Sequence, residues 1–270
     1  MKVSCALYLE AEAEEELLTL DWASLPEPVM VLGGGSNLLF TKDFPGTVLH
    51  VGIGGITRHA DDRVTCGAGV VFDDFCAWAA AEGLWGPENL SLIPGECGAS
   101  AVQNIGAYGV EAKDILADIR AYDRQEGRFV HIDPATCAYG YRTSRFKTEW
   151  KGRYVITAVT YRLSQTPKPV LDYGGIRKAL EGKTLTPLVI RDTIIGIRRE
   201  KLPDPAETGS AGSFFSTPWC RKRSSKASRA ILRTTKWKAA SKSRRPGSSS
   251  SAASREPATG EPRCTRSSRW

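Results

Sequence analysis

The sequence predicts an α+β fold, and four stretches carry that prediction. The apolar runs at 29–32 and 47–51 are each followed by glycine, a pattern typical of β-strands that end in turns. From 71 to 81 the apolar residues recur at helical spacing, with acidic residues in the first turn and Gly83 after the last, which predicts a capped helix with one buried face. The segment 153–163 is rich in β-branched and aromatic residues and predicts another strand. Short strands and helices mixed in one chain favour the α+β class.

The chain of 270 residues is long enough for one large domain or two modest ones. Pro167 and Pro169 mark a linker, and another element is expected to begin at about residue 173. We therefore predict a first domain over residues 1–165, and a linker with the start of a second domain over residues 166–215.

No run of 18 apolar residues occurs, and the N-terminus lacks the basic-then-apolar order of a signal peptide. We expect a soluble, cytoplasmic protein with no membrane partner. The seven cysteines are odd in number, scattered and without a CxxC pair, which predicts reduced thiols rather than a disulfide framework or a zinc site. No metal is expected, and the three histidines are interpreted as surface or packing residues: His50, His59 and His131.

The composition changes after Phe215. Residues 216–270 hold 13 serines and 15 Lys and Arg but only 2 Asp and Glu, a net charge of +13. Because the whole chain carries +7, residues 1–215 carry −6, and the basic balance belongs to the tail alone. Such a segment cannot bury enough apolar surface to offset the entropy of ordering it, so at face value it is a disordered basic tail. It nevertheless contains three tryptophans, which is unusual for a solvated tail: Trp219, Trp237 and Trp270.

A shift of reading frame would account for those tryptophans. Lys236-Trp237-Lys238 must be encoded AAR-TGG-AAR, and reading two bases later gives Val or Met, then Glu, then Gly or Ser. The codons around Trp219 likewise can give Val-Val in that frame. We favour a frameshifted gene over a real basic tail. Sequencing across codons 214–220 tests this, since an uninterrupted frame in several independent reads would contradict it.

Three glycines and two polar residues, GGGSN at 33–37, directly follow the apolar run at 29–32. Without Cβ atoms, such a backbone can turn several N–H groups into one concavity that a phosphate approaches closely. A tight turn between strands is the alternative, and the residues alone leave both open. No G-K-[ST] follows and no GxGxxG opens a helix, so the loop is neither a Walker nor a Rossmann motif.

Glycine recurs in CGAG at 66–69, IPGECG at 93–98 and QNIGAYG at 103–109, which favours a long ligand touched by backbone at several points. With VLGGGSNLLF, these motifs resemble the FAD-binding domain of the p-cresol methylhydroxylase superfamily, and QNIGAYG is typical of its UDP-N-acetylenolpyruvoylglucosamine reductase (MurB) family. The resemblance extends over roughly residues 5–215 and implies non-covalent FAD. The cofactor-binding residues it implies are Gly33, Gly34, Gly35, Ser36, Asn37, Gly69, Pro94, Gly95, Gly98, Asn104, Gly106, Ala107 and Tyr108.

A stretch rich in Tyr and Arg, CAYGYRTSRFK, occupies 137–147. An arginine beside a tyrosine on a Gly-bent backbone supplies a bidentate cation for a carboxylate and a phenol donor, although ordinary surface is the alternative. The stretch resembles the GYRxSxFK motif of the same family. That resemblance implies that Arg142 binds the enolpyruvyl carboxylate and stabilises the developing enolate, and that Tyr141 makes a neighbouring substrate contact.

Three later motifs, VLDYGG, KLPDP and GSAGSFF, also resemble segments of the family. They imply that Tyr173 lies on a loop that folds over the nucleotide substrate and that Lys201 contacts substrate and assists with NADPH. They also imply that Ser213 donates the proton that quenches the enolate. A turn tyrosine, a loop lysine and a structural serine are the respective alternatives.

The family resemblance implies NADPH-dependent reduction of UDP-N-acetylglucosamine enolpyruvate to UDP-N-acetylmuramate through FAD, in peptidoglycan precursor synthesis, by a monomer that binds no nucleic acid. The sequence departs from the family at its end, where the C-terminal glutamate has no counterpart and Thr217 replaces an asparagine. It therefore predicts a p-cresol methylhydroxylase-type FAD domain with a truncated α+β substrate-binding domain, and impaired activity of this copy.

Two alternatives remain open at this point. One is another FAD-dependent oxidoreductase of the superfamily, such as a sugar or alcohol oxidase. The other is a non-catalytic flavin-binding protein whose basic tail contacts nucleic acid, for which a steep salt dependence of DNA binding would be the signature.

Overall fold

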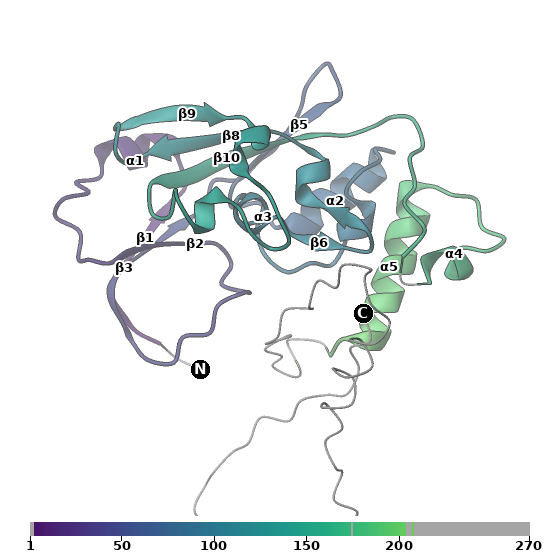
Figure 1. Ribbon diagram of the computed structural model, residues 1–270, viewed down its shortest axis with the longest axis horizontal. Coiled ribbons are helices and arrows are strands. Elements are labelled where there is room, and N and C mark those ends of the chain that lie inside the picture. The colour runs from purple at the N-terminus through teal and green to yellow at the C-terminus, as the bar shows by residue number, and fades with distance from the viewer. Residues whose placement is uncertain (1–2, 174, 204–206, 208–270) are drawn as a thin grey trace, which may run out of the picture. The chain divides into compact units, whose positions relative to one another are not determined.

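The computed structural model describes residues 3–173, 175–203 and 207 (Figure 1). The predicted tail over 216–270 and the predicted proton donor Ser213 lie outside these residues. Strands and helices are mixed along the chain, as the α+β prediction requires, and the strands form a three-stranded sheet, a five-stranded sheet and a short two-stranded ribbon. The ribbon consists of β6 (Gly106–Ala107) and β7 (Val110–Glu111).

The three-stranded sheet is parallel and has the order β1-β3-β2. Its strands are β1 (Cys5–Ala11), β3 (Phe44–Val51) and β2 (Val29–Leu32). The prediction at 29–32 is confirmed, and the strand predicted at 47–51 begins three residues earlier, at Phe44. Helix α1 (Glu14–Thr19) follows β1.

The five-stranded sheet is antiparallel and has the order β4-β5-β10-β8-β9. Its strands are β4 (Ile56–Arg58), β5 (Arg63–Gly67), β10 (Tyr154–Arg162), β8 (Leu116–Asp123) and β9 (Arg128–Ile132). The predicted strand at 153–163 is therefore confirmed as β10, the central strand. Val155, Val159 and Tyr161 on this strand are fully buried, as expected for a strand paired on both edges and covered by helices.

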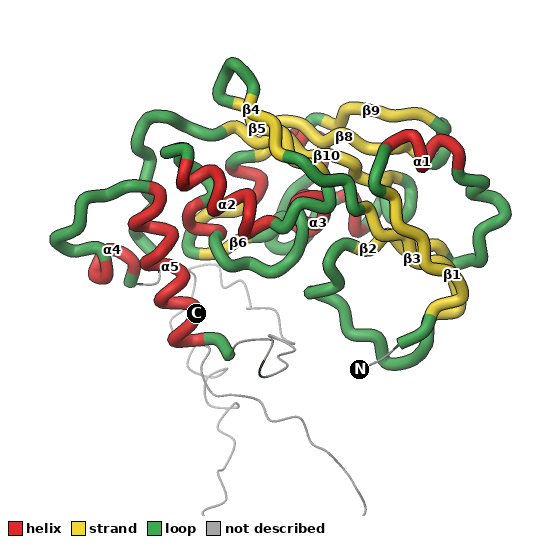
Figure 2. The backbone as a smooth tube through the Cα atoms, turned by 180° about the vertical axis from the view of Figure 1, so that it is seen from behind, coloured by secondary structure: helices red, strands yellow, loops and turns green. Residues whose placement is uncertain are grey.

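Helices α2 (Phe72–Ala81) and α3 (Cys97–Gln103) lie on one side of the five-stranded sheet in both views (Figures 1 and 2). The predicted helix at 71–81 is confirmed as α2, whose buried face includes Phe75, Cys76 and Ala79. Phe75 stacks on Tyr161 of β10 with ring centroids 4.4 Å apart. This aromatic contact belongs to the main hydrophobic core, which spans both large sheets.

A second, smaller core lies under α5 (Pro187–Lys201), a helix that Thr186 caps by accepting a hydrogen bond from the Val189 N–H. Together with α4 (Ile176–Ala179), this helix packs against Trp85 and Tyr108 of the preceding part of the chain. None of the helices within the described residues has the length and apolar character needed to cross a membrane. The five cysteines in that part of the chain are free thiols: Cys5, Cys66, Cys76, Cys97 and Cys137.

Candidate active site

The first predicted glycine loop, 33–37, leaves β2 and runs along α3. A Cβ built on Gly33 would lie 3.1 Å from Glu96 Oε2, at the start of α3, and Asn37 Nδ2 donates to Gln103 Oε1 at its end over 2.9 Å. Gly35 has φ +69°, a left-handed conformation that favours glycine, and no atom lies within 4 Å of its Cβ position. The loop is thus anchored at both ends while its centre presents bare backbone.

The second predicted glycine segment meets a strip that the sequence reasoning missed, VGIGG at 51–55. A Cβ on Gly69 would lie 2.6 Å from the carbonyl carbon of Gly52, and one on Gly98 would lie 2.8 Å from the Cβ of Ala68. Gly69 N–H donates to Ile53 O over 2.9 Å. We call this close backbone packing of Gly52, Gly67, Gly69 and Gly98 the glycine junction. It gives Gly69 and Gly98 a packing reason to be glycine, independent of any ligand.

Two further glycines of the missed strip, Gly54 and Gly55, have no atom within 4 Å of their Cβ positions, and Gly55 has φ +94°. The density of glycine at 52–55 was the available signal in the sequence. In the same region Gly95 has φ +122°, and its Cβ position lies 3.3 Å from Ser36 Oγ of the first loop, whereas Pro94 is exposed. Open backbone on these strips is the kind of cradle that the phosphates of a dinucleotide require.

The QNIGAYG motif ends α3 and connects it to the ribbon. Asn104 is buried in the left-handed conformation; its amide donates to Gly140 O over 3.0 Å and its Oδ1 accepts from Lys113 N–H. A Cβ on Gly106 would lie 3.0 Å from Glu111 Cγ, so this glycine also has a packing reason. Ala107 is partly buried against the core and Tyr108 is buried with φ 50°.

The predicted substrate residues Tyr141 and Arg142 occupy a tight turn between Gly140 and Thr143, which pair as an isolated bridge. Arg142 has φ 51°, and Tyr141 is 67% exposed. The Arg142 Nη2 donates to Asn37 Oδ1 over 3.5 Å. The structure therefore brings the arginine motif to the end of the first glycine loop, although 105 residues separate the two in sequence.

The other two predicted substrate residues that the structure describes are Tyr173 and Lys201. Tyr173 lies over Tyr108, with the rings edge to face and centroids 6.3 Å apart, and it is 41% exposed. Lys201 is exposed at the last position of α5.

Helix α5 is tied to helix α2 through an ion pair. Arg191 donates to both carboxylate oxygens of Asp73 on α2, over 2.5 and 2.9 Å. Asp73 also accepts the Leu92 N–H over 2.5 Å, and Arg198 donates to Leu92 O over 3.1 Å. Leu92 has φ 59°, so a strained residue is held on both sides, just before the 93–98 loop. We call Asp73, Leu92, Arg191 and Arg198 the arginine junction.

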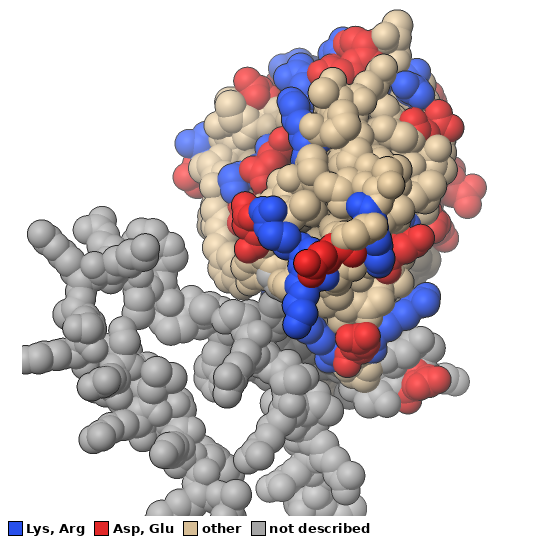
Figure 3. Space-filling view, turned by 90° about the vertical axis from the view of Figure 1, so that its right-hand side faces the viewer, with Lys and Arg blue, Asp and Glu red and all other residues tan. Residues whose placement is uncertain are grey.

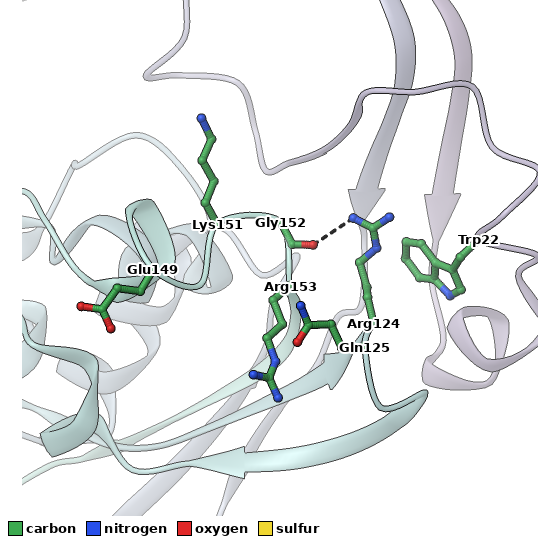
Figure 4. A pocket seen from close by; sticks show the side chains of 7 residues that line it. All are labelled: Trp22, Arg124, Gln125, Glu149, Lys151, Gly152 and Arg153. Carbon is green, nitrogen blue, oxygen red and sulfur yellow. Dashed lines mark hydrogen bonds between the residues drawn. The ribbon is translucent and has the colours of Figure 1, made fainter.

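A pocket of about 520 Å³ lies elsewhere, beside Trp22 (Figure 4). Arg124 lies over the Trp22 ring at 4.6 Å from its centroid and donates to Gly152 O. None of the predicted site residues lines this pocket.

On the face shown in Figure 3, basic and acidic side chains are intermixed rather than gathered by sign. Within the residues described, no group of three or more His, Cys, Asp or Glu is placed to hold a metal ion.

Comparisons with known proteins identify the family of the chain. The family model described as "FAD binding domain" matches residues 6–133. The UDP-N-acetylenolpyruvoylglucosamine reductase of Bacteroides fragilis (strain YCH46) is 48% identical over 224 residues, 80% of this chain and 67% of that protein. The enzyme of the same name from Cupriavidus pinatubonensis is 46% identical over 217 residues, covering 79% of this chain and 65% of its own.

Among solved structures, UDP-N-acetylenolpyruvylglucosamine reductase (MurB) from Thermus caldophilus superimposes with a TM-score of 0.58 at 25% identity, covering 78% of this chain and 68% of that one. The chain thus spans about two thirds of the length of these relatives. The predicted α+β flavin fold is confirmed. The chain belongs to the UDP-N-acetylenolpyruvoylglucosamine reductase family.

Proposed function

We propose that this chain derives from an enzyme that reduces UDP-N-acetylglucosamine enolpyruvate to UDP-N-acetylmuramate with NADPH, through non-covalently bound FAD, in peptidoglycan precursor synthesis. The observation that carries the proposal is the position of Asn37, which bonds Gln103 at the end of α3 and accepts from Arg142. Three motifs far apart in sequence meet at this residue, so a cofactor on the glycine loop would lie next to a cation suited to a carboxylate.

The described residues fit the cofactor. Bare backbone at Gly35, Gly54 and Gly55 offers room where a side chain would otherwise stand, and N–H groups in such loops bind phosphate oxygens. We propose that the loops 33–37, 93–98 and 103–108 hold FAD. When bound there, FAD would supply the hydride chemistry between NADPH and the enolpyruvyl double bond.

The protein's own residues orient the substrate and manage its charge. Arg142 is exposed at a tight turn, where its guanidinium can bind the substrate carboxylate and offset the negative charge that builds as the hydride adds. Ser213 gives a proton to the adjacent carbon, so that hydride and proton together saturate the double bond. Tyr141, Tyr173 and Lys201 are proposed substrate contacts. The domain boundary near 165 remains part of the proposal, as do a monomeric state, a cytoplasmic location and the lack of nucleic-acid or membrane partners.

The test is a two-step colour change. Purified protein should be yellow, NADPH should bleach the flavin band, and UDP-N-acetylglucosamine enolpyruvate should restore it in protein made from the frame-restored gene. The chain as given should bind flavin but show little or no turnover, because its segment after residue 215 replaces the family's C-terminal region. Failure of the frame-restored protein to reoxidise with that substrate would refute the assignment.

A further inference from the structure

His50, on β3, is held between two carboxylates. Its Nδ1 lies 2.9 Å from Glu10 Oε1 on β1, and its Nε2 lies 3.1 Å from Glu96 Oε1 at the start of α3. The side chains of His50 and Glu96 are 20% and 12% exposed, whereas that of Glu10 is 47% exposed. Only the protonated imidazolium can donate from both ring nitrogens at once, so this arrangement favours the charged form.

The two carboxylates reach the glycine strips on which the flavin is proposed to bind. Glu96 oxygens lie 3.1 and 3.3 Å from the Cβ positions of Gly33 and Gly34, and Glu10 Oε1 lies 3.2 Å from that of Gly52. A row of carboxylate, imidazole and carboxylate therefore runs from the glycine loop at 33–37 to the glycine-rich strip at 51–55. A diphosphate on these loops would have negative charge as its neighbour, and the row contains a single group that can offset it.

Helix capping does not explain Glu96. It occupies the N-cap position of α3, but its side chain accepts no capping hydrogen bond from that helix. The side chain turns instead toward His50 and the glycine loop.

No other titratable group described beside His50 supplies positive charge. Tyr8 on β1 has a pKa raised by burial and by Glu10 and Glu96, so it stays a neutral phenol. The neighbouring strand β2 has the sequence VMVL, and the loop 33–37 has only Gly, Ser and Asn. Burial lowers the pKa of His50, but its hydrogen bonds to Glu96 and Glu10 outweigh this and raise the pKa above its usual value.

We propose that His50 is a positioning residue for the cofactor: as an imidazolium it holds Glu96 against the glycine loop and offsets its charge, so that FAD is bound most tightly while His50 is protonated. The inference rests on the proposed function, because it takes FAD as the ligand of the loops. The direction of the pH dependence follows from the linkage between proton binding at His50 and FAD binding. As pH rises and His50 loses its proton, two uncompensated carboxylates remain beside the diphosphate, and the affinity for FAD falls.

The experiment measures the dissociation constant of FAD for the full chain, stripped of flavin, from pH 6 to pH 9 by quenching of flavin fluorescence. We expect the wild-type affinity to fall about tenfold across this range, the effect of one neighbouring charge worth roughly one pKa unit. His50→Gln should bind weakly at every pH with a flat profile. Glu96→Gln should bind tightly at pH 9 and show a shallower fall with pH than the wild type, because the repelling carboxylate is gone while His50 still titrates beside Glu10.

The matched control is His131→Gln. His131 also pairs with a carboxylate, Asp118 at 2.6 Å, but it lies on β9 away from the glycine loops; this variant should keep the wild-type profile. The double variant His50→Gln with Glu96→Gln separates charge from structure. If charge is the cause, it should bind FAD more tightly than His50→Gln alone, whereas a merely structural role would leave it as weak or weaker.

The melting temperature of each flavin-free variant reports separately on folding. A wild-type pH profile retained by His50→Gln, or binding by Glu96→Gln that is weaker at all pH values by one factor, would overturn the inference while leaving FAD as the ligand. If the wild-type chain binds no FAD at any pH, the proposed function fails and this inference fails with it.

Discussion

The glycine junction and the arginine junction join different parts of the same molecule by opposite means. In the first, backbones approach so closely that a Cβ on Gly67 would lie 2.2 Å from Ile53 O. In the second, one carboxylate on α2 collects two side-chain bonds from Arg191 and one backbone bond from Leu92. The first therefore depends on the absence of side chains and the second on charge. They should respond to different perturbations, one to added volume and the other to pH.

The largest effect is expected from Gly69→Ala. Its Cβ would meet backbone atoms of Gly52 at 2.6 Å, and backbone cannot move aside as a flexible side chain can. We expect the free energy of unfolding to fall by about 3 kcal/mol, as measured by urea denaturation. Gly54→Ala is the matched control, because nothing lies within 4 Å of that Cβ position. Equal losses in the two variants would show that close packing is not the cause.

A smaller loss is expected from Asp73→Ala, which leaves Arg191 without its carboxylate and the Leu92 N–H without its acceptor. The side chains of Arg191 and Asp73 are 12% and 22% exposed, so solvent screens the pair only in part and we expect a loss of about 2 kcal/mol. Asp172→Ala removes an exposed partner of Arg177 and should change the unfolding free energy by less than about 0.5 kcal/mol. If both substitutions had the same effect, the arginine junction would be no more than a surface ion pair.

The arginine junction should also weaken in acid. Burial raises the pKa of Asp73, but the hydrogen bonds from Arg191 and from the Leu92 N–H outweigh it and lower the pKa below its usual value. The stability it contributes is thus present above the unfolded-state pKa of about 3.9 and is lost as pH falls through the lower folded-state pKa. The difference in unfolding free energy between wild type and Asp73→Ala should therefore shrink between pH 6 and pH 3. A constant difference would contradict this linkage, whereas the loss caused by Gly69→Ala should not depend on pH.

The smallest effect, with the opposite sign, is expected from Gly196→Ala. This glycine is exposed in α5, and nothing lies within 4 Å of its Cβ position. Alanine should stabilise the helix by roughly 0.5–1 kcal/mol, a rise that thermal denaturation can detect. A loss of stability would mean that α5 is packed more closely at this position than the structure shows.

Local sequence patterns correctly predicted the elements whose structure depends mainly on nearby residues. The strand at 29–32, the helix at 71–81 and the central strand at 153–163 all follow from apolar spacing and β-rich composition. Spacing was less informative where pairing decides the structure. Strand β3 begins at Phe44 and includes Pro45 and Gly46, residues that locally favour a turn, because pairing with β1 and β2 extends it.

The residues of the site likewise divide into those that the sequence could identify and those that it could not. The glycine loops could be recognised as motifs, and the contact of Arg142 with Asn37 brings two of them together. The reason for glycine at 69 could not be read from sequence, since the strip that it packs against is a separate segment. The interpretation of His50 as a surface or packing residue missed its contacts, because Glu10 and Glu96 come from elements that are 40 and 46 residues away.

The place of β10 at the centre of the five-stranded sheet has a consequence for synthesis on the ribosome. Both β5 and β8 pair with this strand, and it is the last of the sheet to be made. Until it emerges, the nascent chain can form only the β4–β5 and β8–β9 pairs, each with one edge that lacks its β10 partner. Once it emerges, the sheet can close while the ribosome is still upstream of the codons where the frame is proposed to change. We expect a flavin domain that has already folded by the time the altered tail is translated.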